Sequence, residues 1–357
     1  MKKSFILMSF FLTYSLYAQD SVQTSFSVDY TTEIQTNFGK KYNWANLLSL
    51  SAELPTEKIN KRFKNGNFQM EIISIYKIFE ERIADDLMTF SNIEEDNLLI
   101  SPFLLGYTHR WKKISLFGGV RNVNQDYFIT PYTSLFTNSS AGIFPTLSIN
   151  FPLANYPLSG VCLHFEYEPT EKLLFKSSLY NGVAHDPRKN ILQPFAVNPR
   201  KDGVFSISEL SYTHNKFGSG RYSLGVALQT FGKQVSSTYS IWGTVEQTVF
   251  NNDKKEIGFI VHGGLAPSMK NECRYYFATG GYFAGLLTKH KRDKLGIYLN
   301  ITEISGIKEQ TLEITLQYQI IDIIVIQPTF HCIRTGKKIT NIGLLRVLVS
   351  VGSDRLL

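Results

Sequence analysis

The sequence predicts an all-β fold, namely a transmembrane antiparallel outer-membrane β-barrel of about 16 strands. Three observations predict it. Polar and apolar residues alternate along most of the chain, the N-terminus has the features of an export signal, and no apolar stretch reaches the roughly 18 residues that a membrane-spanning helix needs. The oiliest stretch, residues 320–328, is short and is broken by Asp322.

The first 18 residues have the pattern of a secretory signal peptide. Lys2 and Lys3 precede an apolar stretch, residues 4–17, and the small residue Ala18 suits the position before a cleavage site. An N-terminal anchor helix is the alternative, but the residues that follow are polar. We therefore expect export, and a single barrel domain over residues 19–357.

The alternation is clearest in TLEITLQYQI, residues 311–320, where every second residue from Leu312 onward is apolar and every residue between is polar. Successive side chains of a strand point to opposite faces, so this segment has an apolar face and a polar face. A soluble sandwich and a membrane barrel both use such strands. Ten residues also match the roughly 9 to 11 that a tilted strand needs to cross a bilayer.

Similar segments recur at residues 68–78, 221–229, 294–301 and 345–351, and turn sequences such as NNDKK, GSG and RTGKK join them. Their polar faces carry small residues and mixed charges, which favours a barrel lumen over the Lys/Glu-rich face of a solvated sheet. Aromatic residues gather near segment ends, which suits the aromatic girdles of a membrane barrel. These residues are Trp111, Tyr127, Phe128, Phe250 and Tyr282.

Two segments depart from the pattern. In GVFSISELSY, residues 203–212, the two faces do not sort cleanly around Glu209, which predicts a β-bulge. Pro328 lacks a backbone donor within a strand-like segment, so we expect it at a bulge or near the rim of the barrel.

Metal, cofactor and enzyme chemistry have little support. Cys162, His164 and Glu166 share one face of a strand, but a flat strand spaces them about 6.6 Å apart, too far for one ion, so we expect no metal and no cofactor. The seven histidines show no spacing typical of a catalytic pair. Cys162, Cys273 and Cys332 form no disulfide framework.

The formal net charge of +7 comes from basic clusters in turn-like stretches. In an exported chain such clusters suit solvated loops or contacts with the phosphates of outer-membrane lipid, and we expect no nucleic-acid partner.

Several pieces of the chain, in order, resemble the OprB-type carbohydrate-selective porins. They include ADDLMTFSNIEEDNLL, SLFGGVRNVNQDYF, the long stretch at residues 134–182, and LEITLQYQIIDIIVIQPTFHCI followed by GLLRVLVSVG. The resemblance runs from about Asp29 to Gly352. The Gln327-Pro328 pair matches the family, whereas Arg121 stands where the family often has an acidic residue, and the chain does not end on an aromatic residue.

The resemblance implies a 16-stranded barrel in the outer membrane of a Gram-negative cell that passes sugars by diffusion, and it suggests a homotrimer. Asn124 and Asp126 follow the family's motif, and alternation places the other candidates on the lumen face. A lumen of mixed sign offers donors and acceptors to sugar hydroxyls without a strong ion preference. The pore-lining candidates are Arg121, Asn124, Asp126, Glu166, Arg221, Tyr298, Glu313, Gln317 and Arg346. The alternatives are a non-selective general diffusion porin and a non-conducting barrel that acts as an adhesin or scaffold.

Overall fold

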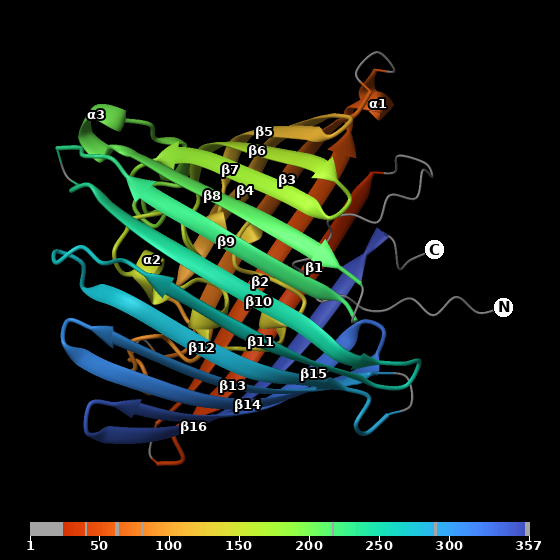
Figure 1. The fold of residues 1–357 in the computed structure, drawn as a ribbon, viewed down its shortest axis with the longest axis vertical. Helices are drawn as coiled ribbons and strands as arrows, with labels where there is room; N and C mark the ends of the chain where they lie inside the picture. Colours follow the sequence, from red (N-terminus) through yellow and green to blue (C-terminus); the bar gives the residue numbers. More distant parts are fainter. Residues whose placement is uncertain are drawn as a thin grey trace.

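The computed structural model describes residues 24–39, 41–60, 64–79, 81–215, 218–233, 235–288 and 291–353. The expected signal peptide and residues 354–357 lie outside the described residues. The described chain forms a closed barrel (Figure 1), in which 16 antiparallel strands follow the order of the sequence and β1 pairs with β16. The predicted fold class and strand number are confirmed.

The strands are β1 (Ser25–Thr36), β2 (Tyr42–Pro55), β3 (Gly66–Lys77), β4 (Leu98–Trp111), β5 (Ile114–Arg121), β6 (Gly160–Thr170), β7 (Leu173–Asn181), β8 (Val204–His214), β9 (Gly220–Gln229), β10 (Thr238–Asn251), β11 (Glu256–Leu265), β12 (Cys273–Ala284), β13 (Asp293–Ile304), β14 (Ile307–Ile321), β15 (Ile324–Thr335) and β16 (Lys338–Gly352). The helical turns are α1 (Thr56–Ile59), η1 (Val123–Gln125), η2 (Thr133–Leu135), η3 (Ser139–Ala141), α2 (Pro145–Ser148), η4 (Gln193–Phe195) and α3 (Pro199–Asp202). Within the described ranges, no helix is long and apolar enough to cross a membrane.

The loops at the two ends of the barrel differ in length. The helix α1 connects β2 to β3 at one end, and α3 belongs to the β7–β8 connection at the other end (Figure 1). The end that carries α3 also carries the β3–β4 loop (residues 78–97) and the β5–β6 loop (residues 122–159). Both of these loops contain many buried residues and pack against the inner side of the strands.

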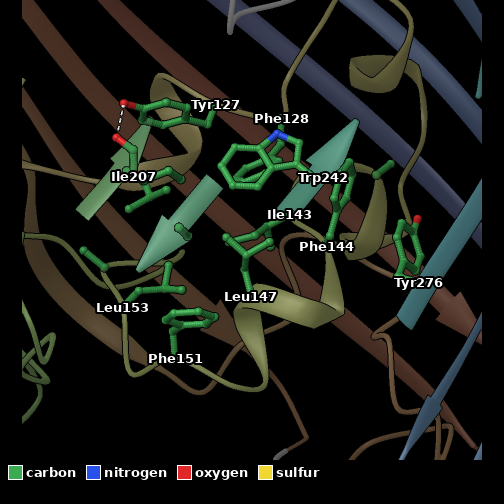
Figure 2. Packing of buried hydrophobic residues seen from close by; sticks show 14 of the residues in the cluster. Tyr127, Phe128, Ile143, Phe144, Leu147, Phe151, Leu153, Ile207, Trp242 and Tyr276 are labelled. Atoms are coloured by element: carbon green, nitrogen blue, oxygen red, sulfur yellow. Dashed lines mark hydrogen bonds between the residues drawn. The ribbon is translucent and has the colours of Figure 1, made fainter. Parts of the chain in front are cut away.

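An apolar core fills part of the barrel. It combines residues of the β5–β6 loop with inward-facing side chains of β8, β10 and β12, as Figure 2 shows. The Phe128 ring lies 5.1 Å from Trp242, and the Phe144 ring lies 5.2 Å from Tyr276, measured between ring centroids. The lumen is therefore divided between a packed region and an open cavity.

The bulge expected in β8 is not present. Phe205, Ile207 and Glu209 all face inward and are buried, and the registers of β8 with β7 and β9 run without a shift. The strand alternates regularly, but its inner face is partly apolar because it packs against the β5–β6 loop. The Tyr127 hydroxyl donates to the Ile207 carbonyl at 3.2 Å across this contact (Figure 2).

The expected bulge or rim position of Pro328 is also wrong. Pro328 lies inside β15 opposite Leu345 of β16. On the β14 side the register is the same at Thr315–Thr329 and at Tyr318–Ile326, on either side of the proline. The missing donor therefore interrupts the hydrogen-bond ladder without shifting the strands.

The aromatic girdle is only partly as expected. Trp111 and Phe250 are about half exposed on the barrel, as a girdle requires. Tyr127, Phe128 and Tyr282 are buried inside the barrel and contribute to the packing of the β5–β6 loop. The five aromatic residues therefore divide between the outer surface of the barrel and its packed interior.

Candidate functional site

Glu313 of β14 fixes the β5–β6 loop to the barrel wall. Its carboxylate accepts hydrogen bonds from the backbone N–H of Thr137 at 2.7 Å, from the Thr137 hydroxyl at 3.1 Å and from the backbone N–H of Asn138 at 3.0 Å. Beside it, Phe136 stacks on Tyr298 with ring centroids 4.6 Å apart. Both wall residues are fully buried and act as contacts for the loop.

A second carboxylate of the barrel wall holds the same loop at another point. Glu246 of β10 accepts a hydrogen bond from the Thr130 hydroxyl. Nearby, Tyr132 stacks on Tyr282 at 4.4 Å between ring centroids and hydrogen-bonds to Thr248. The loop is therefore tied to β10, β12 and β14, which fixes its position across the lumen.

The β3–β4 loop is anchored in a similar way. Glu309 of β14 accepts hydrogen bonds from the backbone N–H groups of Leu87 at 2.7 Å and Met88 at 2.8 Å. Within the loop, Asp86 accepts from the backbone N–H of Phe90 at 2.6 Å and from Arg82 at 2.6 Å. Burial raises the pKa of Asp86 to about 6, although Arg82 favours the charged form.

Arg346 of β16 links this loop to the wall. Its Nε donates to Glu33 of β1 at 2.6 Å, and its Nη2 donates to the Asn92 side chain at 2.6 Å. The Ser91 hydroxyl donates to the same Glu33 carboxylate at 2.7 Å. The guanidinium is thus held in one orientation by Glu33 of the neighbouring strand β1 and by Asn92 of the loop.

A cavity of about 460 Å³ remains between these loops and one side of the wall. Its wall side comes from the inward faces of β1, β2 and β3 together with Gln317, Gln327 and Arg346 of the last three strands. Its other side comes from the β3–β4 and β5–β6 loops. Most of the polar groups that face it are carboxylates, amides and hydroxyls, among them Ser49, Glu53 and Gln69.

Arg121 and Asn124 lie where the β5–β6 loop leaves β5. The Arg121 guanidinium forms an ion pair with Asp126 at 2.9 Å and lies 4.7 Å from the centre of the Phe117 ring. The Asn124 amide donates to the Gly142 carbonyl at 2.8 Å, which connects two distant parts of the β5–β6 loop. Both side chains border the cavity and have fixed orientations.

Four of the nine predicted pore-lining residues border this cavity, and five lie elsewhere in the lumen. The four are Arg121, Asn124, Gln317 and Arg346. Of the other five, Asp126 lies behind Arg121, and Glu313 and Tyr298 lie beneath the β5–β6 loop. Glu166 contacts His164 at 3.3 Å and Arg221 contacts Glu209 at 3.6 Å, both on the wall outside the cavity.

Several cavity residues were absent from the predicted set. Gln69 lies on the polar face of the 68–78 segment, so the alternation identifies its side of the barrel but not its depth. Glu94 lies in a loop, where alternation gives no signal. In the described part of the chain, no group of three or more His, Cys, Asp or Glu side chains is arranged to hold a metal ion.

The comparisons with known proteins rest on structure alone. No family model matches the sequence, and no curated protein matches it. The high-pH structure of Pseudomonas putida OprB is similar with a TM-score of 0.79 and 14% identity, covering 92% of this chain and 94% of that chain. The chain has the fold of the outer-membrane porins.

Two further solved structures agree with this fold. The trimer form of OmpT, an outer membrane protein of Vibrio cholerae, has a TM-score of 0.57 at 11% identity and covers 92% of this chain and 99% of that chain. A mutant of the Rh. blastica porin has a TM-score of 0.57 at 9% identity, covering 92% and 100%. The resemblance seen in the sequence is confirmed at the level of the fold.

Proposed function

We propose that this chain is an outer-membrane porin, a channel and not an enzyme, through which carbohydrates and other small hydrophilic solutes diffuse passively. The observation that carries the proposal is a cavity of about 460 Å³, bordered by both apolar and polar or charged side chains, inside a closed barrel with the porin fold. Cavities of roughly 300 to 1,000 Å³ accommodate small organic molecules.

The chemistry of the cavity suits hydroxylated solutes. A sugar hydroxyl both donates and accepts hydrogen bonds, and the cavity offers acceptors such as Glu71 and Gln317 and donors such as Arg346. Contacts of this kind are individually weak, which lets a solute enter and also leave. The anchored loops keep the passage narrow, so each solute meets these groups in turn.

The outer face and the N-terminus support an outer-membrane location. Apolar side chains such as Ile314 and Leu345 are exposed on the outside of the barrel, where lipid would cover them. The expected signal peptide would direct the chain out of the cytoplasm. We further propose a homotrimer, with the trimer form of V. cholerae OmpT as the supporting comparison.

A swelling assay with sugar-loaded medium tests the proposal. Liposomes that contain the refolded protein should swell in isotonic glucose or sucrose, and a Ser51→Trp variant should swell more slowly because Ser51 borders the cavity. The matched variant Leu50→Trp lies next to it on the exposed outer face and should behave like the wild-type protein. Liposomes that do not swell would favour the non-conducting adhesin or scaffold.

A further inference from the structure

The cavity carries an excess of acidic groups. Among the described residues that border it, five carboxylates stand against two guanidinium groups. The carboxylates are those of Asp29, Glu53, Glu71, Glu94 and Glu95, and the guanidinium groups are those of Arg121 and Arg346. The mixed-sign lumen expected from the sequence counted Glu166, Arg221 and Glu313, which lie outside this cavity.

Both arginines are already neutralised by carboxylates that do not border the cavity. Arg121 pairs with Asp126 at 2.9 Å, and Arg346 pairs with the fully buried Glu33. A guanidinium beside its own carboxylate attracts an anion weakly. The positive charges at the cavity surface are therefore largely cancelled.

Two wall carboxylates have neutral partners. Glu71 accepts hydrogen bonds from the Ser49 hydroxyl at 2.7 Å and from the Gln125 amide at 2.9 Å. Glu53 accepts from the Gln69 amide at 3.0 Å. Within the described residues, no ion pair reaches either carboxylate. Neutral donors orient a carboxylate but leave its charge in place.

Glu94 of the β3–β4 loop provides an independent observation. It is 6% exposed and borders the cavity, yet neither of its carboxylate oxygens accepts a hydrogen bond from any described residue. Its ion-pair contact is a long one, 3.9 Å to the Nε of Arg82, a side chain that is 42% exposed. A buried carboxylate without donors is costly, so a donor that enters the cavity would satisfy it.

We propose that the cavity prefers cationic, amine-bearing polyols and sugars over neutral and anionic solutes of the same size, with Glu94, Glu71 and Glu53 as the groups that recognise the amine. An ammonium group offers three donors and no acceptor, and its hydrogen bonds to carboxylates are charge-assisted. The hydroxyls of the same solute pair with the amides and hydroxyls of the wall. This proposal rests on the proposed channel function.

The preference should depend on pH through Glu94. Burial raises the pKa of Glu94 to about 7, while Arg82 favours its charged form. The other charged groups that face it are Asp86 of its own loop, Lys77 of β3 and Glu33 of β1. The carboxylate is charged above about pH 7 and neutral below, so the preference for amines weakens as the pH falls from 8 to 6.

Three solutes with one carbon skeleton test the proposal. Sorbitol, 1-amino-1-deoxysorbitol and gluconate are neutral, cationic and anionic at pH 8. Uptake of each labelled solute is measured in liposomes that contain the full exported chain. We expect the amine to enter about tenfold faster than gluconate, and faster than sorbitol, because a cleft lined by one sign of charge concentrates the opposite sign.

The variants separate recognition from folding. Glu94→Gln and Glu71→Gln should each reduce the ratio of amine to gluconate uptake at least about threefold. Glu303→Gln removes a carboxylate of β13 that does not border the cavity, and should leave all three rates unchanged. The wild-type pH profile tests Glu94 without any substitution.

The outcomes distinguish this proposal from the channel function. If sorbitol does not enter, the channel function itself fails. If sorbitol enters and the amine and gluconate enter at equal rates, the channel function stands and the amine preference is overturned. An amine preference that stays constant between pH 8 and pH 6, or that Glu94→Gln leaves as large as in the wild-type protein, would overturn the role of Glu94.

Discussion

Replacing Glu313 by alanine should release the β5–β6 loop from the wall while the barrel stays closed. The substitution removes the acceptor for the backbone N–H groups of Thr137 and Asn138 and for the Thr137 hydroxyl, all of which are buried. A buried donor left without a partner costs about 1 to 3 kcal/mol. The two N–H groups together should therefore destabilise the docked loop by about 2 to 6 kcal/mol.

The barrel itself should be unaffected, because the 16 described strands are held by their own ladders. Two assays follow the loop. Limited proteolysis should cut within residues 122–159 of the Glu313→Ala variant under conditions where the wild-type loop resists, and single-channel current should become larger and noisier as the loop leaves the lumen.

Glu303→Ala is the matched control, because Glu303 pairs with Lys308 on the outer face of the barrel, next to the inward-facing Thr302, whereas both anchored loops pack inside. It should behave like the wild-type protein in both assays. A Glu313→Ala variant with wild-type protease resistance and wild-type current would refute the anchoring role of this carboxylate.

Three other predictions concern the membrane face, the cavity and the pH response. Replacing the outward-facing Ile314 by Arg should lower the free energy of unfolding by about 2 to 4 kcal/mol, because the position is near the midplane of the membrane. Replacing Gln317, which borders the cavity, by Arg should lower it little. Urea titration of folding into vesicles measures both. Arg346→Ala should weaken block by sugar and shift the channel towards cations, whereas Lys338→Ala, on an exposed ion pair, should change neither in bilayer recordings. The pKa of Asp86 is raised from 3.8 to about 6, so the docked β3–β4 loop binds a proton on Asp86 more tightly than the free loop does. The free energy of docking should therefore weaken by up to about 3 kcal/mol as the pH rises through about 6. Protection factors from amide hydrogen exchange in this loop measure the change.

Alternation was sufficient to predict the barrel because the inward and outward faces of most strands differ in chemistry. In β14 the residues Thr311, Glu313 and Thr315 are buried inside, and Ile314 and Ile320 are exposed outside, as the sequence pattern indicates. The rule failed in β8, where Phe205 and Ile207 face inward. A polar lumen face cannot be assumed once a loop packs an apolar core against it.

Alternation predicts which face of a strand a side chain lies on, but not how deep in the lumen it lies. Glu313 and Gln317 lie four residues apart on the same face of β14, yet one anchors a loop and the other borders the cavity. The difference depends on where the β5–β6 loop lies, which is a long-range property. The sequence does contain one signal for it, because residues 127–136 are rich in aromatic residues and lack the alternation of a strand.

Single-channel recording of the refolded protein with added neutral sugar tests the central claim most directly, because it asks whether the cavity is a passage that sugars occupy. The account predicts a modest conductance that millimolar sugar blocks in part, since a solute held by the cavity walls excludes ions. Free passage of small ions with no block by sugar would contradict the carbohydrate function and indicate a general diffusion pore, and the absence of any conductance would contradict the channel itself.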